Sequence, residues 1–274
     1  MKNVAPGLHV AAGQAANVAA YDRYVGRWSR LFVPAVIAAS ETTSGCSVLD
    51  VSTGTGEAAL MGLAAVGKSG LVVGADIAPA MLFGARDRLK QPLFYPVAAD
   101  GQMLPFESGS FDAVICQLGL QFFPEPERGL AEFHRVLRHG RRAAVCVIST
   151  PQRAPMFGVL ADVLSRFVPE QRDFLHLSFA LADANRLERM FVSAGFHEVR
   201  VERVQREDTI GSFEEYWDPL ESGMGQLPQI YLALPEAHRR EVRKEVKSRL
   251  SVFETNGRLV MRAEMLIGVG RKAP

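Results

Sequence analysis

Two glycines, one residue apart, follow an apolar segment that contains a carboxylate. Asp50 lies near the end of the run Cys46–Val51, and the turn at residues 52–56 contains Gly54 and Gly56. Glycine lets the backbone turn tightly because it has no Cβ, and a helix that begins directly after the turn would point free N–H groups at a ligand. This pattern predicts a site that binds a nucleotide-type ligand largely through the backbone.

Two further carboxylates follow the next apolar segments. Asp76 ends the run Leu71–Asp76, and Asp100 comes shortly after the run Leu93–Val97. In a doubly wound sheet the carboxyl ends of neighbouring strands meet at one edge. We therefore expect Asp50, Asp76 and Asp100 to surround one site.

The glycine turn is compatible with two cofactors. Residues 54–59 satisfy the dinucleotide pattern G-x-G-x-x-A, and Asp76 follows about 20 residues later, as that pattern requires. However, Asp50 at the strand end would repel a diphosphate, whereas it suits a ligand with an ammonium group. Asp76 is placed for ribose hydroxyls and Asp100 for an adenine amine. These acids favour S-adenosylmethionine, while an NAD(P)-dependent oxidoreductase and a non-catalytic cofactor-binding protein stay as alternatives.

Several segments resemble class I S-adenosylmethionine-dependent methyltransferases of the ubiquinone and menaquinone biosynthesis group. The similar segments are Tyr21–Ser29, Val72–Leu82, Asp100–Phe106, Ser110–Val114, Cys116–Pro124 and Glu132–Leu137. The chain departs from this group at Ser52, where glycine is usual, and at residues 139–141, where Pro-Gly-Gly is usual. The resemblance implies an enzyme that transfers methyl groups from S-adenosylmethionine.

The residues and the resemblance together assign a cofactor site. The residues expected to bind the cofactor are Asp50, Ser52, Thr53, Gly54, Gly56, Asp76, Ile77, Met81, Asp100, Gly101, Gln117, Leu118, Gly119, Phe122, Tyr24 and Arg27. The resemblance alone implies the roles of Ile77 and Met81 at ribose and adenine, and of Tyr24 or Arg27 at the methionine carboxylate. Core packing is the competing interpretation for these side chains and for Phe122. Gln121 and Phe122 are expected to face the transferred methyl.

The chemistry does not require a dedicated base or a metal. A sulfonium methyl is already electrophilic, so alignment of the acceptor and exclusion of water are the main tasks of the protein. His176 is the one histidine that we consider as a catalytic base. The spacing of Cys46, Cys116 and Cys146 fits no zinc pattern, and each lies in a strand-like run, which indicates buried thiols.

Strand-like and helix-like segments alternate through the middle of the chain. Strands are expected at Cys46–Val51, Leu71–Asp76, Leu93–Val97, Phe111–Gln117, Ala143–Ser149, Val199–Val204 and Glu264–Val269. Helices are expected at Glu57–Val66, Pro79–Leu89, Glu125–Arg138, Ala154–Phe167 and Asp183–Ala194 and after Pro235, and Ser212–Glu215 is a capping-box pattern. This alternation predicts an α/β fold with a doubly wound, mostly parallel seven-stranded sheet.

The remaining segments predict helical caps on a single domain of residues 1–274. The caps are expected at about residues 1–40, 151–182 and 208–257. Apolar side chains in the last two segments favour a small, partly hydrophobic acceptor. They include Phe157, Leu160, Leu164, Phe167, Phe174, Phe179, Trp217 and Tyr231.

Bulk composition argues against a nucleic-acid partner. The formal net charge is +1 over 274 residues, so no strong field would attract a polyanion. No uncharged apolar run reaches the roughly 18 residues of a membrane span, and the first residues lack a signal-peptide pattern. We therefore expect a cytoplasmic protein without a membrane span.

Overall fold

A single twisted sheet organises the chain. The computed structural model describes residues 18–223 and 225–274, and the first 17 residues of the predicted N-terminal cap lie outside this range. The strand order is β3-β2-β1-β4-β5-β8-β6, with β7 paired on β8. The strands are β1 Ser47–Val51, β2 Leu71–Asp76, β3 Phe94–Ala98, β4 Phe111–Gln117, β5 Leu137–Ile148, β6 His197–Ile210, β7 Glu254–Thr255 and β8 Arg258–Arg271.

The sheet is mostly parallel, as predicted. Strands β1 to β5 pair in parallel, whereas β8 runs antiparallel to both β5 and β6. Every residue of β4 is buried, which fits its unbroken apolar character because a central parallel strand is covered on both faces. The seven strands of the main path confirm the predicted sheet, and the two-residue β7 is an addition.

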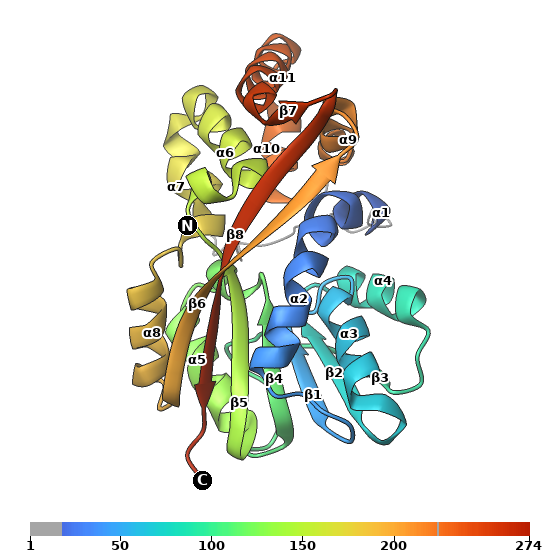
Figure 1. The fold of residues 1–274 in the computed structure, drawn as a ribbon, viewed down its shortest axis with the longest axis vertical. Coiled ribbons are helices and arrows are strands. Elements are labelled where there is room, and N and C mark those ends of the chain that lie inside the picture. The colour runs from blue at the N-terminus through green and yellow to red at the C-terminus, as the bar shows by residue number, and fades with distance from the viewer. Residues whose placement is uncertain (1–17, 224) are drawn as a thin grey trace.

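Helices cover both faces of the sheet (Figure 1). One face packs against α2 (Arg27–Ala39), α3 (Glu57–Val66) and α4 (Pro79–Leu89), and the other against α5 (Pro126–Val136) and α8 (Ala184–Ser193). The apolar side chains of each helix recur at intervals of three or four residues, so they form one stripe that is buried against the sheet. The doubly wound arrangement follows from these two apolar layers.

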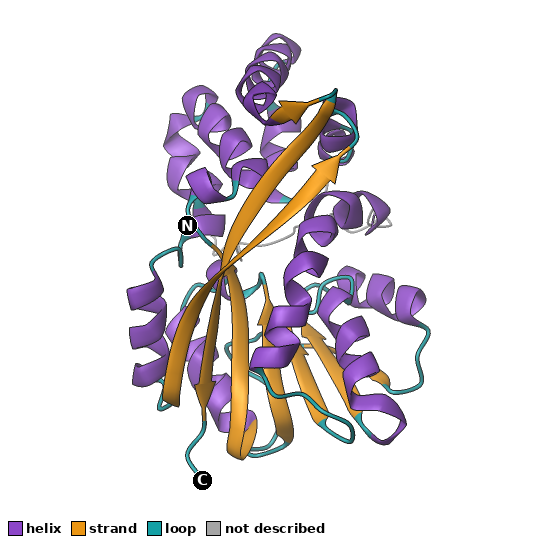
Figure 2. Cartoon of the chain, in the orientation of Figure 1, coloured by secondary structure: helices purple, strands orange, loops and turns teal. Residues whose placement is uncertain are grey.

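A second group of helices lies beyond the carboxyl ends of the parallel strands (Figures 1 and 2). These helices are α1 (Val18–Tyr21), α6 (Pro155–Phe167), α7 (Arg172–Leu175), α9 (Phe213–Trp217), α10 (Gln226–Ala233) and α11 (Glu236–Leu250). A π-helical turn, Asp22–Gly26, joins α1 to α2. Ser212 caps α9 by accepting a hydrogen bond from the Glu215 N–H, as the capping-box pattern predicts.

Short 3₁₀ turns connect many of these elements. They are Gly67–Ser69, Leu120–Phe122, Pro151–Arg153, Pro169–Gln171, Leu177–Phe179, Leu220–Ser222 and Ser251–Phe253. None of the helices within residues 18–223 and 225–274 has the length and apolar character needed to cross a bilayer.

Four elements had boundaries that differ clearly from the expected ones. Helix α5 ends at Val136 instead of Arg138, because Leu137 already pairs with Phe111 in the sheet. Strand β5 therefore begins at Leu137 instead of Ala143. Strands β6 and β8 are each 14 residues long and pair with each other well beyond the expected segments. Figure 1 shows this pair as a twisted arm that reaches from the sheet to the upper helices.

Candidate active site

The turn after β1 forms the floor of a cleft at the carboxyl edge of the sheet. Ser52, Gly54 and Gly56 all adopt positive φ angles of 58°, 55° and 84°. A side chain at residue 56 would also lie 2.9 Å from Leu89 Cδ1 of α4. Gly56 therefore serves the turn and its packing against α4, whereas Ser52 and Gly54 line the cleft itself.

The cleft offers about 920 Å³ of space free of protein atoms, part of it open to solvent. Its lining consists of Tyr21, Ser52, Gly54, Asp76, Ile77, Ala78, Met81, Ala99, Asp100, Gly101, Gln102, Gln117, Leu118, Gly119, Phe122, Phe123 and Pro124. Eleven residues of the predicted cofactor site are among them: Ser52, Gly54, Asp76, Ile77, Met81, Asp100, Gly101, Gln117, Leu118, Gly119 and Phe122.

Asp50 and Gln117 both line a smaller cavity next to the cleft, and each has a buried oxygen atom without a hydrogen-bond partner among the described residues. Asp50 is completely buried, and its Oδ2 accepts a hydrogen bond from Thr53 Oγ1 at 2.7 Å. The Gln117 Nε2 donates to the Ser29 carbonyl at 3.2 Å. No described residue completes a hydrogen bond to Asp50 Oδ1 or Gln117 Oε1, although both residues line the smaller cavity. Two buried acceptors without donors match a group rich in donors, such as an ammonium.

The environment of Asp50 changes its acidity. Burial raises the pKa of the Asp50 carboxyl to about 7. The Thr53 hydroxyl opposes that rise by donating a hydrogen bond, and the Ala59 N–H also opposes it, although it does not complete one. The nearby charge of Asp76 adds to the increase. A cation bound in the smaller cavity would favour the ionised carboxylate and lower this pKa again.

Asp76 links the glycine turn to the end of β2. Its Oδ2 accepts from the Gly54 N–H and its Oδ1 from the Ala78 N–H, each at 2.9 Å. Burial raises the pKa of Asp76 although these two bonds oppose the change. Each carboxylate oxygen retains a second lone pair, so Asp76 can also accept hydrogen bonds from a ligand in the cleft.

Asp100, Ile77 and Met81 also belong to the cleft lining. Asp100 Oδ1 accepts from the Gln102 N–H at 2.9 Å and lies in the lining. Ile77 lines the cleft and is 57% exposed, so it does not belong to the core. Met81 is 1% exposed, so it belongs to the core and also lines the cleft. Within the described residues, no lysine, arginine or histidine lines the cleft or the smaller cavity. A diphosphate would therefore find no cation here.

A third cavity adjoins the cleft on the side of the upper helices. It offers about 650 Å³ free of protein atoms, part of it open to solvent, and shares Tyr21, Leu118 and Phe122 with the cleft. Its other lining residues are Tyr24, Val25, Gln121, Ile148, Phe157, Ser178, Gly225, Gln226, Leu227 and Pro228. The cavity is thus mostly apolar, and three shared residues form its boundary with the cleft.

Comparison with known proteins identifies the family. A family model, the ubiE/COQ5 methyltransferase family, matches residues 25–206. The chain belongs to this family. It is therefore an S-adenosylmethionine-dependent methyltransferase, which confirms the predicted enzyme class and cofactor. The family match does not favour the NAD(P)-dependent alternative.

Individual relatives agree with this assignment. The methyltransferase is 35% identical to a demethylmenaquinone methyltransferase of Corynebacterium kroppenstedtii, over 57% of this chain and 69% of that protein. It is 31% identical to the ubiquinone/menaquinone biosynthesis C-methyltransferase UbiE of Teredinibacter turnerae, over 65% of this chain and 78% of that protein.

Solved structures show the same fold. The phosphoethanolamine N-methyltransferase 2 of Haemonchus contortus, in complex with S-adenosyl-L-methionine, matches with a TM-score of 0.59 at 16% identity, over 94% of this chain and 57% of that one. The YcgJ protein of Bacillus subtilis also matches with a TM-score of 0.59, at 14% identity, over 90% of this chain and 99% of that one.

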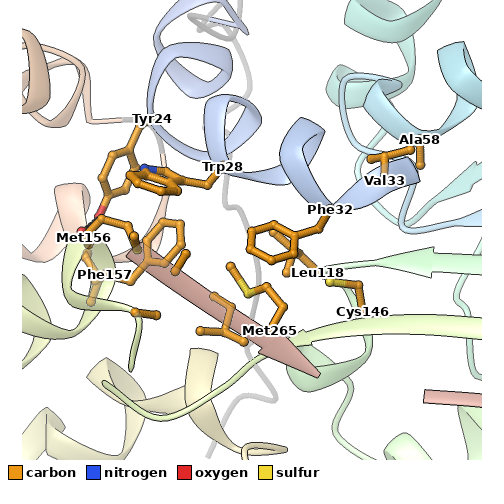
Figure 3. Close-up of a cluster of buried hydrophobic side chains, with 14 of the residues drawn as sticks. Tyr24, Trp28, Phe32, Val33, Ala58, Leu118, Cys146, Met156, Phe157 and Met265 are labelled. Carbon is orange, nitrogen blue, oxygen red and sulfur yellow. Dashed lines mark hydrogen bonds between the residues drawn. The ribbon is translucent and has the colours of Figure 1, made fainter. Parts of the chain in front are cut away.

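The methyltransferase places Tyr24 and Arg27 outside the cleft. The Tyr24 hydroxyl donates to the Met156 carbonyl at 3.2 Å, and Figure 3 shows its ring beside Trp28 and Met156. Arg27 forms ion pairs with Asp208 and Glu215. Neither residue is part of the cleft lining, whereas Tyr21, three residues before Tyr24, lines all three cavities. Tyr21 is thus a site residue that the sequence analysis did not select.

His176 also lies apart from these cavities. Its Nε2 is 3.2 Å from Ser165 Oγ and 3.4 Å from Asp162 Oδ1, both on α6, and it is absent from the three linings. The structure thus gives His176 local partners on α6, and its role as a base stays a prediction.

The described part of the methyltransferase shows no group of three histidine, cysteine or carboxylate side chains that could hold a metal ion. Cys46, Cys116 and Cys146 are all buried and free of disulfides.

Proposed function

We propose that this methyltransferase transfers the methyl group of S-adenosylmethionine to a small, apolar ring compound of the quinone class, held in the third cavity. The observation that carries the proposal is the boundary formed by Tyr21, Leu118 and Phe122, which belong to both the cleft and the third cavity. The relatives named above support the ring class, since their names refer to demethylmenaquinone, ubiquinone and menaquinone.

The cleft residues would hold the cofactor by its polar groups. Asp50 and Gln117 would accept hydrogen bonds from the ammonium of the methionine part, Asp76 from the ribose hydroxyls and Asp100 from the adenine amine. Ile77 would cover a face of the ring. When bound, S-adenosylmethionine supplies an electrophilic methyl group on a cationic sulfur.

The contribution of the chain is orientation and exclusion of water. Among the described residues, the lining of the third cavity contains no carboxylate, lysine, arginine or histidine that could remove a proton at neutral pH. Correct alignment of two reactants can lower a barrier by about 7–11 kcal/mol. An activated ring carbon or oxygen would therefore react without a dedicated base. Its proton would pass to solvent either before water is excluded or after the site opens again.

A turnover experiment tests this proposal. The purified protein is incubated with S-adenosylmethionine and a panel of reduced naphthoquinones, with glycine and phosphoethanolamine as hydrophilic comparators. The formation of S-adenosylhomocysteine and of the methylated product is measured by mass spectrometry. Methylation of the ring compounds is the expected result, and turnover with the hydrophilic compounds alone would contradict the proposed acceptor class.

Three sequence-based expectations stay predictions beside this proposal. They are the cytoplasmic location, the absence of a nucleic-acid partner and the division into one domain with cap segments.

A further inference from the structure

Gln121 carries an unpaired amide in the wall of the third cavity. Its side chain is 2% exposed and lies on the 3₁₀ turn Leu120–Phe122 that follows β4. Neither its Oε1 nor its Nε2 has a hydrogen-bond partner in the described part of the chain. The assignment of oxygen and nitrogen in an amide can be reversed, but here both atoms are free, so the conclusion is the same for either orientation.

An unpaired buried amide is unfavourable for folding. A donor or acceptor that is removed from water without a new partner costs about 1–3 kcal/mol. Gln121 carries one of each and lines the cavity proposed to hold the acceptor. A buried polar group of this kind requires an explanation, and a ligand that pairs with both atoms is the one that its position indicates.

Two other polar side chains of the cavity have partners. The Tyr24 hydroxyl donates to the Met156 carbonyl at 3.2 Å. Gln226 Nε2 donates to the Phe174 carbonyl, which leaves Gln226 Oε1 as a further free acceptor. No charged side chain lies in the described lining. The cavity therefore presents one amide with a free donor and acceptor in largely apolar surroundings.

The free donor and acceptor of Gln121 determine which polar group of the acceptor the cavity can bind. A hydroxyl group both donates and accepts, so it can pair with both atoms of the Gln121 amide. A carboxylate can only accept, and it would bring a charge to a site without a cation. A hydrocarbon would leave the amide unpaired.

We propose that Gln121 is a specificity-determining residue, whose amide binds a neutral hydroxyl group of the acceptor by donating to its oxygen and accepting its hydrogen. The inference rests on the proposed function, because it assigns the third cavity to the acceptor. An amide does not take up a proton at neutral pH, so Gln121 positions the hydroxyl and is not a base.

Two probes of matched shape test this inference. 1-Naphthol and 1-methylnaphthalene differ only by a hydroxyl in place of a methyl group, and their binding to the protein saturated with S-adenosylhomocysteine is measured by ligand-observed NMR. The wild-type protein is expected to prefer 1-naphthol about tenfold, which corresponds to one well-made hydrogen bond. Gln121→Leu is expected to bind the two probes within about twofold of each other.

The thermal stability of the same variants separates binding from a structural role. Gln121→Leu should raise the melting temperature, since it removes two unpaired polar atoms from a buried position. Gln121→Met, with an unbranched side chain of similar length, provides a second apolar variant if leucine prevents folding. Gln91→Leu makes the same change on the exposed surface and should leave probe preference unchanged.

The possible outcomes are distinct. Equal binding of the two probes to the wild-type protein, or an unchanged preference in both apolar variants, would overturn the role of Gln121 and leave the proposed function standing. Lower melting temperatures with weaker binding of both probes would assign Gln121 to structure. Failure of both probes to bind the wild-type protein would overturn the acceptor cavity and the inference together.

Discussion

Asp50 of β1 and Gln117 of β4 line one small cavity, and each has a buried oxygen atom without a hydrogen-bond partner among the described residues. Their strands are neighbours, and Asp50 is in register with Ile115, so Gln117 lies two residues further toward the carboxyl edge. This pair explains why the site suits an ammonium group better than a phosphate.

The first prediction concerns cofactor affinity. Asp50→Asn keeps the shape of the side chain but removes its charge, so the ammonium loses a charge-assisted hydrogen bond worth about 1.5–3 kcal/mol. We expect S-adenosylhomocysteine to bind about 10- to 100-fold more weakly in calorimetry. Asp87→Asn, on the exposed surface of α4, is the matched control and should bind as the wild type does. Equal affinity in both variants would contradict the assignment.

The second prediction concerns the pH dependence of binding. Burial raises the pKa of Asp50 to about 7 in the free protein. At lower pH the protonated carboxyl group must therefore lose its proton to bind an ammonium. The affinity for S-adenosylhomocysteine should increase from pH 5 to about 7 and level off by pH 8. Calorimetry in buffers of different ionisation enthalpy should detect proton release at pH 6, and Asp50→Asn should abolish it. Affinity that falls over this range would have the wrong sign.

The third prediction concerns stability in the absence of cofactor. Asp50 is harder to ionise in the folded state than in the unfolded state, where its pKa is near 3.8. Protonation of Asp50 therefore stabilises the folded state. This stabilisation is fully present below pH 3.8 and is lost as the pH rises to about 7. Asp50→Asn should be more stable than the wild type at pH 8, by on the order of 2–4 kcal/mol, and about equal at pH 4. Denaturant unfolding at both pH values measures this difference.

The fourth prediction concerns Arg27. Its guanidinium contacts Asp208 and Glu215 and donates to the Thr209 carbonyl at 2.7 Å, so it joins the start of α2 to the end of β6 and to α9. Arg27→Ala should lower stability by about 1–2 kcal/mol, after allowance for its partial exposure to solvent. Cofactor affinity should change by less than about twofold.

Arg27→Lys supplies the control for this position. Lysine retains the positive charge but lacks the planar guanidinium group. We therefore expect a loss of stability between zero and that of Arg27→Ala. A large drop in cofactor affinity with unchanged stability would instead support the methionine-carboxylate contact that the sequence suggested.

The fifth prediction concerns His176. Since its ring contacts Ser165 and Asp162 and is absent from the three cavity linings, His176→Ala should retain methyl transfer within about twofold of the wild-type rate. The pH–rate profile should also be unchanged. Loss of activity by a factor of 100 or more would restore His176 as a catalytic base.

Local sequence signals were sufficient for the core of the fold. The bounds of α3, β2, α4 and β4 agree with the expected residues, because glycine, proline and unbroken apolar runs mark these elements within the chain itself. The lengths of β6 and β8 could not be predicted in this way. Charged side chains alternate along β6, and some pair across to β8, as Glu207 does with Arg262, so no apolar pattern marks the strand.

The candidate site shows the same division. Asp76 and Asp100 were predicted because strand ends in a doubly wound sheet meet at one edge, and the structure places both in the cleft lining. Whether Tyr21 or Tyr24 lines the cleft depends on the direction in which each ring points from α1 and the π-helical turn. Helical spacing alone does not determine this direction. The surroundings of Gln121 likewise come from distant segments, since residues of α6 and α10 line the same cavity.

The most direct test of this account is a crystal structure with S-adenosylhomocysteine. The account predicts that the amino group of the ligand lies within hydrogen-bond distance of Asp50 Oδ1 and Gln117 Oε1, with the ribose on Asp76 and the sulfur facing the third cavity. A ligand bound in the reverse direction, or a diphosphate-containing nucleotide in the same cleft, would contradict it.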